Sequence, residues 1–352
     1  MTLLLLPSRL GARRPGQSLR PRLFGLDGRV LLADRGNGPS GALGNAETGQ
    51  AWSGATWTRD GAGAAINTPT LGAEVLTDPG LEATYTAGLC NSLIKPAGGI
   101  VAQSADVHGG SKAQEFTAGA ASDRIVATPT TVVGIWYHVS GWAKRTAGSG
   151  GTVQLQTVAG FPITTVGTIS GASYTQYFGI GKATGTNGQI RVAESGSVNF
   201  DTIITDDWSL KALTLASLFC TVDCYASDVL VEAEVSVVAG TQAGLVLRLD
   251  SASNPQSFLI AHHNGTNLVL ETAAGLTYAT PISTAATYAQ WRKISVELRG
   301  NSVRAFYNQV QIGNWQTLSD ARLLGGTRFG LFSTYSGNAI RNLTVRRLGQ
   351  AA

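Results

Sequence analysis

Apolar and polar residues alternate along much of this chain, as they do in β-strands that bury one face. The clearest example is residues 228–237, whose apolar face consists of Val229, Val231, Ala233, Val235 and Val237. Further short apolar stretches follow at residues 244–249, 258–260, 267–271, 292–298, 303–307, 329–332 and 340–345. Turn sequences such as Asn264-Gly265 separate them. The pattern predicts an all-β fold built from antiparallel strands.

Composition supports this prediction. Only 14% of the residues are charged, 44 are glycine, and the single methionine is Met1. Long helices favour the opposite balance, whereas short strands joined by glycine-rich turns favour this one. The length of 352 residues allows two or three domains at roughly 100–200 residues each.

The first turn-rich segment carries a family resemblance. Residues 34–52, DRGNGPSGALGNAETGQAW, resemble the opening of concanavalin A-like (laminin-G-like) sandwich modules found in phage and bacterial surface proteins. The strands of residues 228–345 resemble the remainder of the same module.

The segment between these two pieces resembles another family. Residues 74–82 (EVLTDPGLE), 136–144 (WYHVSGWAK) and 200–210 (FDTIITDDWSL) are similar to the opening, middle and closing strands of family 4/9/22-type carbohydrate-binding jelly rolls. Leu81 stands where that family usually has Phe, and Trp208 stands where it usually has Val.

Together the resemblances predict two antiparallel β-sandwich (jelly-roll) domains, one inserted in the other. The host sandwich is expected at residues 30–70 plus 211–348, and the carbohydrate-binding-like jelly roll at 71–210. Insertions of this kind are tolerated because sandwich domains usually have neighbouring termini. The alternative is a plain tandem in which residues 30–70 belong to the N-terminal arm.

Positive charge is concentrated in residues 1–29, the basic N-terminal arm. Six arginines against Asp27 give it +5, so the remainder carries −1 of the net +4. Such a body does not resemble a nucleic-acid-binding domain. The arm is expected to dock on other virion proteins, or else to be a flexible tail; the arginines expected to make that contact are Arg9, Arg13, Arg14, Arg20 and Arg22.

We expect neither a secretory leader nor a membrane span. In MTLLLLP the basic residues follow the short apolar run instead of preceding it. No stretch approaches the ~20 apolar residues of a membrane span. The three cysteines make a poor disulfide framework, and three buried thiols in a protein made in a bacterial cytoplasm are expected.

Motifs for catalysis are weak. Glu232 and Glu234 share a strand face, but Val237 stands where sandwich glycosidases often place a third acid, so a solvated strand face is the favoured interpretation. The histidines, including His262 and His263 beside a predicted turn, lack metal-ligand spacing and are interpreted as surface residues. The prediction is a protein that is not an enzyme.

Calcium is the cofactor that the second resemblance implies. The related jelly rolls commonly hold a structural Ca²⁺ where the opening and closing strands meet, and the matching positions here are Gly80, Glu82 and Asp207. The alternative is an acid pair that is simply hydrogen-bonded at a strand end.

Aromatic rings can stack on the apolar faces of sugars, so they are the candidate carbohydrate-binding residues. These candidates are Trp136, Tyr137, Tyr177 and Trp315. A role in the core is the competing interpretation for each ring.

These features favour a structural or adhesion component of a phage-like particle, such as a fibre, spike or tail component. The arm would anchor it in the virion. The expected partners are other virion proteins and cell-surface polysaccharide, and a homo-oligomer is expected. The alternatives are a glycan-degrading enzyme and a secreted bacterial carbohydrate-binding protein.

Overall fold

The computed structural model describes residues 26–148, 152–161, 164–196 and 200–349. The five arm arginines therefore lie outside the described residues. The described chain contains strands and two short 3₁₀ turns, η1 (Leu215–Leu218) and η2 (Ala321–Leu323), and no α-helix. Its strands form antiparallel sheets stacked in pairs, which confirms the predicted all-β sandwich fold.

Residues 26–67 and 215–348 together form one sandwich, called here the split sandwich. Its first sheet contains β2 (Gly41–Ala42), β3 (Trp57–Arg59), β4 (Ala65–Asn67), β27 (Ala339–Leu348), β18 (Val229–Ser236), β23 (Arg292–Arg299), β24 (Ser302–Tyr307) and β25 (Val310–Thr317), in that order, with β1 (Leu26–Asp34) also paired to β27. Its second sheet has the order β17 (Phe219–Asp223), β26 (Arg328–Ser333), β19 (Ala243–Leu249), β20 (Phe258–His263), β21 (Asn267–Ala274) and β22 (Thr277–Ala285).

Residues 71–213 form the other sandwich, called here the middle sandwich. One sheet has the order β14 (Thr175–Lys182), β11 (Trp136–Ala147), β16 (Thr202–Leu213), β9 (Ala113–Thr117) and β8 (Ile100–Ser104), with β5 (Leu71–Glu74) also paired to β16. The facing sheet has the order β10 (Arg124–Ala127), β15 (Gln189–Glu194), β12 (Val153–Val158) and β13 (Thr164–Thr168), and a separate hairpin contains β6 (Tyr85–Thr86) and β7 (Leu89–Cys90).

The alternation that predicted a strand at residues 228–237 is present as β18. Its apolar face lies in the core of the split sandwich, while Glu232 and Glu234 lie on the outer face. β1 pairs with β27 over its described length, so residues 26–29 of the predicted arm belong to a strand.

The turn-rich segment at residues 34–52 closes around a buried ion pair. The Asp34 carboxylate accepts two hydrogen bonds from the Arg59 guanidinium, both 3.0 Å, and one from Trp52 Nε1 at 2.8 Å. Gly36 has φ +80°, and a Cβ there would lie 2.3 Å from the carbonyl oxygen of Gly63. Glycine is therefore required at this turn for its backbone freedom and its small size.

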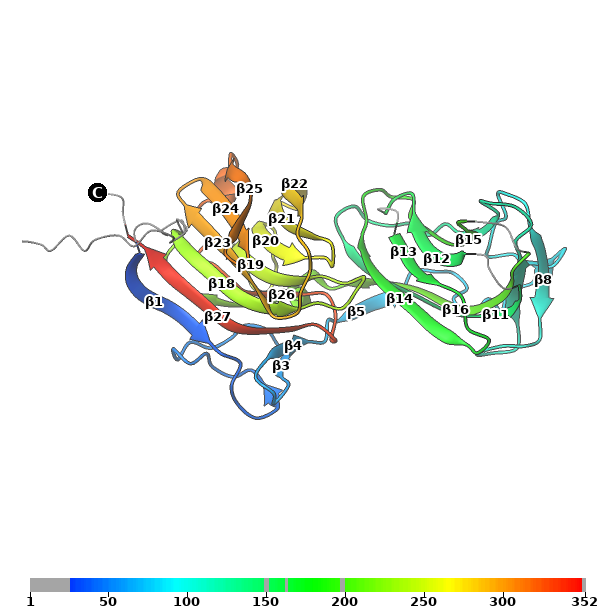
Figure 1. Ribbon diagram of the computed structural model, residues 1–352, viewed down its shortest axis with the longest axis horizontal. Coiled ribbons are helices and arrows are strands. Elements are labelled where there is room, and N and C mark those ends of the chain that lie inside the picture. Colours follow the sequence, from blue (N-terminus) through cyan, green and yellow to red (C-terminus); the bar gives the residue numbers. More distant parts are fainter. Residues whose placement is uncertain (1–25, 149–151, 162–163, 197–199, 350–352) are drawn as a thin grey trace, which may run out of the picture.

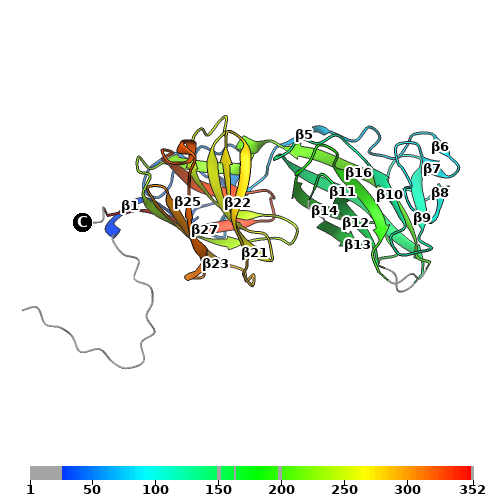
Figure 2. The ribbon, with the colours of Figure 1, turned by 90° about the horizontal axis from the view of Figure 1, so that it is seen from above.

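The two sandwiches lie end to end, and β27 ends at the end of the split sandwich that faces away from the middle sandwich (Figure 1). Their two connections run side by side, because β5 pairs with the end of β16 (Figure 2). An apolar cluster fills the junction, with Trp136, Ile180 and Leu213 from the middle sandwich packed on Phe219, Phe258, Phe332 and their neighbours from the split sandwich. The backbone N–H of Ile180 also donates to Gly240 O at 3.0 Å.

Two further expectations concern the cysteines and membrane-spanning segments. Cys90, Cys220 and Cys224 are buried free thiols, as predicted. Within the described ranges, no helix is long and apolar enough to cross a membrane.

Candidate functional site

A cleft of about 770 Å³ lies beside the apolar junction, with walls from both sandwiches. The middle sandwich contributes the start of β11, with the loop before it, and the end of β14. The split sandwich contributes the outer face of β20, β21 and β22. The volume lies in the range of small-molecule binding sites, about 300–1,000 Å³.

An ion pair between the sandwiches forms part of the wall. Lys182 Nζ on β14 lies 2.5 Å from Glu271 Oε2 on β21, and the two side chains are only 17% and 12% exposed. Lys182 Nζ also lies over the rings of Trp136 and Tyr278, at 4.8 and 4.5 Å from their centroids. The two rings meet edge to face at 5.9 Å. Each sandwich therefore supplies one charge and one ring to the same cluster.

The environment of Glu271 favours its ionised form. Burial alone would raise the pKa of Glu271, but contact with His262 and Lys182 outweighs burial and lowers that pKa to about 2. Burial raises the pKa of Tyr278 above its usual value, so its hydroxyl keeps its proton. Glu271 is thus a fixed anion, and Tyr278 is a neutral donor and acceptor.

Two buried polar atoms in the cleft lining have no hydrogen-bond partner in the protein. They are Tyr278 Oη and His262 Nδ1. The His262 side chain is 6% exposed, and its other nitrogen lies 4.0 Å from Glu271 Oε1. Buried polar groups are nearly always hydrogen-bonded, and an unpaired one costs about 1–3 kcal/mol. Both atoms are therefore the candidate polar contacts for a ligand in the cleft.

Of the four aromatic candidates from the sequence, Trp136 is the one that lines this cleft, but it is 3% exposed and packs in the apolar junction cluster, so its ring has no open face for a sugar. Tyr137 is also 3% exposed, because β11 is covered on both faces; its hydroxyl accepts a hydrogen bond from Val132 N at 2.9 Å. Its ring has no open face for a sugar, which corrects the expectation. Tyr177 is half-buried against the middle-sandwich core. Trp315 on β25 is 41% exposed, with the Arg304 guanidinium 4.5 Å from its ring centroid.

The prediction of surface positions for His262 and His263 was wrong. Both are buried, at 4% and 0% exposure, because β20 lies between β19 and β21 within its sheet. His263 Nε2 lies 2.8 Å from Ala286 O, and its Nδ1 accepts from Gly265 N. His263 therefore has a structural role at the end of β20, whereas His262 faces the cleft.

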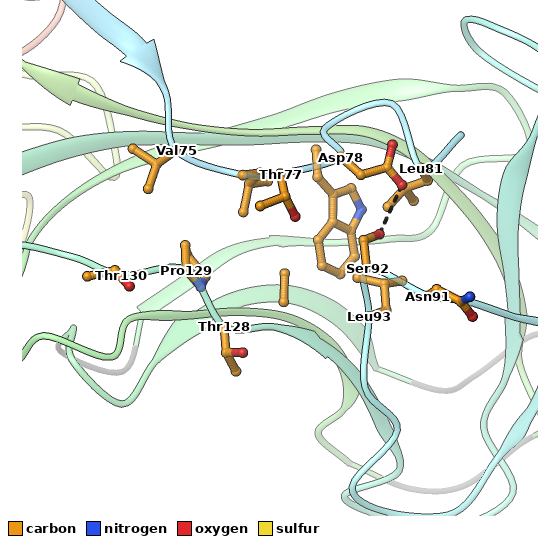
Figure 3. Close-up of a pocket in the computed structure, with 13 residues that line it drawn as sticks. Val75, Thr77, Asp78, Leu81, Asn91, Ser92, Leu93, Thr128, Pro129 and Thr130 are labelled. Carbon is orange, nitrogen blue, oxygen red and sulfur yellow. Dashed lines mark hydrogen bonds between the residues drawn. The ribbon is translucent and has the colours of Figure 1, made fainter. Parts of the chain in front are cut away.

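A second cavity, of about 380 Å³, opens in the middle sandwich beside the segment EVLTDPGLE (Figure 3). Asp78 on its wall accepts hydrogen bonds from Glu82 N, Ala83 N and Ser92 Oγ. Trp208 lines the cavity but is 1% exposed, and its Nε1 donates to Thr205 Oγ1 at 2.6 Å. The polar groups of these two residues already have protein partners, so this cavity makes a weaker ligand site than the cleft.

The three residues that the resemblance assigns to calcium, Gly80, Glu82 and Asp207, lie next to one another. The two carboxylates contact hydrogen-bond donors of the protein. Glu82 accepts from Ser111 N, Ser111 Oγ and Lys112 N, at 2.7, 2.7 and 3.0 Å. Lys112 Nζ donates to Glu82 O at 2.7 Å and also contacts Ala83 O. Asp207 Oδ2 lies 2.7 Å from His108 Nδ1.

Calcium needs six to eight oxygen ligands at about 2.3–2.6 Å. Here the Lys112 ammonium donates hydrogen bonds to two carbonyl oxygens, and backbone N–H groups donate to the Glu82 carboxylate. Among the described residues, no cluster of three or more His, Cys, Asp or Glu residues could hold a metal ion. This donor set does not fit calcium; it matches the alternative of hydrogen-bonded acids at a strand end.

The paired glutamates of β18 also have partners that suit a structural role. Glu234 accepts from Arg341 Nε at 2.9 Å, and Glu232 lies 3.6 Å from Lys293 Nζ and accepts from Ser295 Oγ. Both carboxylates lie on the outer face of the sheet, where cationic neighbours hold them.

Neither a protein-family model nor a curated protein sequence matches this chain. Among solved structures, it is similar to the carbohydrate-binding module CBM66 from Bacillus subtilis, with 12% identity over 34% of this chain and 76% of that one, at a TM-score of 0.29. It is also similar to the N-terminal CBM22-1–CBM22-2 tandem domain of Paenibacillus barcinonensis Xyn10C, with 10% identity over 80% of this chain and 98% of that one, at a TM-score of 0.34. The fold assignment rests on the strand topology itself.

Proposed function

We propose that this protein is a non-catalytic glycan-binding protein whose ligand lies in the cleft between the two sandwiches. The observation that carries the proposal is the pair of buried, unpartnered polar atoms, Tyr278 Oη and His262 Nδ1, in an aromatic-lined cleft. Ligand sites typically combine apolar and aromatic walls with a few fixed polar groups. Sugars present both C–H faces and hydroxyl groups, so their chemistry matches both kinds of wall.

The chemistry of the cleft supports binding without hydrolysis. A glycosidase needs an acid that is protonated at its working pH and a second carboxylate about 5–9.5 Å away. In the described part of the chain, Glu271 is the one carboxylate in the lining, and its pKa of about 2 keeps it ionised at neutral pH. It is also paired with Lys182, which removes it from the role of a general acid.

The setting that we propose is the surface of a phage-like particle, where the N-terminal arm docks on another virion protein. The support is the segregation of charge: residues 1–29 carry +5 and the rest carries −1. A basic arm on a nearly neutral body suits an anchor that pairs with an acidic surface while the sandwiches stay free for host glycans.

The binding proposal is tested by screening a glycan array and then measuring the hits by calorimetry with wild-type protein and two matched variants. Tyr278→Phe removes the unpartnered hydroxyl and should weaken binding. Tyr307→Phe removes a hydroxyl that bonds Ala289 N and O, outside the cleft, and should leave affinity unchanged. A glycan whose affinity is unchanged by Tyr278→Phe contradicts the proposed site.

The particle proposal needs a separate experiment. Immunogold electron microscopy of purified particles should label them when the chain is intact and leave them unlabelled when residues 1–25 are deleted. Equal labelling of both preparations, or of neither, contradicts anchoring by the arm.

A further inference from the structure

We infer that the cleft selects an uncharged, hydroxyl-rich oligosaccharide and rejects acidic ones such as uronate-containing or sulfated chains. This inference rests on the proposed function and specifies the ligand class for the same site. It follows from how the charges, the neutral polar groups and the apolar groups are distributed over the cleft wall.

The charges of the lining neutralise one another. Lys182 and Glu271 are its one cation and one carboxylate, and they are paired at 2.5 Å while largely buried. Lys182 is further covered by the rings of Trp136 and Tyr278. Taking one partner from a buried ion pair is strongly unfavourable, because it leaves the other charge uncompensated. An anionic ligand would have to break this pair or enter a site with no free cation among its described lining residues.

The remaining polar wall is neutral and suits hydroxyl groups. Apart from the residues already discussed, the polar side chains of the lining are hydroxyls and amides, namely Thr184, Gln242, Asn264, Thr277, Thr280 and Ser283. Thr184, Thr277 and Thr280 are exposed, and they come from both sandwiches. Hydroxyls donate and accept equally well, so they complement a ligand whose own groups do the same.

The rim adds apolar surface for the C–H faces of sugar rings. Val133 and Leu276 line the cleft from opposite sandwiches and are 54% and 36% exposed. The volume of about 770 Å³ is large within the usual range of ligand sites, so it suits a short oligosaccharide better than a single sugar. A ligand of that length would contact both sandwiches at once.

The inference is tested by calorimetry at about pH 8. Neutral gluco-, xylo- and manno-oligosaccharides are compared with uronate-containing and sulfated oligosaccharides of the same length. Each is measured at low and at high salt. We expect a neutral oligosaccharide to bind at least about tenfold more tightly than its acidic counterpart, with an affinity that salt leaves unchanged.

Two variants on one strand locate the binding. Thr280→Val removes a hydroxyl from the cleft wall, whereas Thr284→Val removes an exposed hydroxyl from β22 outside the lining. Thr280→Val and Tyr278→Phe should each weaken neutral binding several-fold, and Thr284→Val should leave it unchanged.

Tighter, salt-sensitive binding of an acidic oligosaccharide that Tyr278→Phe weakens overturns the inference and leaves the cleft as the glycan site. Binding of either class that neither Tyr278→Phe nor Thr280→Val affects overturns the proposed site. No binding of any oligosaccharide overturns the proposed function together with the inference.

Discussion

Replacing Tyr278 with phenylalanine removes one oxygen atom from the cleft and leaves the ring in place. In the free protein that oxygen is buried and has no protein partner. Its loss therefore ends a desolvation penalty of about 1–3 kcal/mol without breaking a hydrogen bond. We expect Tyr278→Phe to be more stable than wild type by about 1 kcal/mol, or a rise in melting temperature of roughly 2–4 °C.

Binding should change in the opposite direction. A neutral hydrogen bond to a ligand contributes about 1 kcal/mol, so its loss should raise the Kd roughly fivefold. Urea unfolding, followed by tryptophan fluorescence, measures the first effect, and calorimetry with the selected oligosaccharide measures the second. The opposite signs distinguish a ligand-binding hydroxyl from a structural one.

Tyr307→Phe breaks two hydrogen bonds to Ala289, so it should lower stability by about 1 kcal/mol and leave the Kd unchanged. If Tyr278→Phe instead lowers stability by about as much as Tyr307→Phe, the Tyr278 hydroxyl has a partner within the fold, which contradicts its unsatisfied state.

Three further predictions concern charge, metal and thiols. Glu271 has a pKa of about 2, below its ordinary 4.5, so its stabilisation, about 3 kcal/mol, should be complete above about pH 5 and lost as pH falls toward 2. Urea titrations at several pH values should show this loss in wild type and not in Glu271→Gln, and parallel curves would contradict it. EDTA and added Ca²⁺ should leave the melting temperature unchanged, whereas Lys112→Met should lower stability by about 1 kcal/mol; a rise with Ca²⁺ would contradict the lysine assignment. Burial raises the pKa of Cys224 to about 12 and also raises those of Cys90 and Cys220, so a thiol reagent should label these residues only after unfolding, and rapid labelling of native protein would contradict their burial.

The parts of the fold that local pattern determines could be predicted from the sequence. The alternation around Val231 predicted β18, because one face of that strand lies in the core and the other meets polar partners. The motif from Asp34 to Trp52 could be recognised as turn chemistry, although its closing partner, Arg59, was not identified.

The candidate site was less predictable because its walls come from segments far apart in the chain. Lys182 and Glu271 are 89 positions apart and carry no motif. Trp136 and Tyr137 point to opposite faces of β11, so alternation alone predicts that one ring is exposed. Both are buried because the split sandwich covers the outer face at Trp136. Periodicity within one strand cannot indicate coverage that another domain supplies.

A signal for His262 was present but ambiguous. The adjacent Asn264-Gly265 turn suggested an exposed hairpin end, yet β20 runs through His263 and is flanked on both sides. An apolar strand of the type Phe-Leu-Ile-Ala leading into a histidine favours burial more than its turn favours exposure. A buried histidine without a full set of partners then becomes a candidate for ligand contact.

A crystal structure with a bound neutral oligosaccharide tests the central claim most directly. The sugar should lie between the two sandwiches, with hydroxyl groups within hydrogen-bond distance of Tyr278 Oη and His262 Nδ1 and with the Lys182–Glu271 pair intact. A sugar bound elsewhere, for example stacked on the exposed ring of Trp315 with the cleft empty, would contradict the claim.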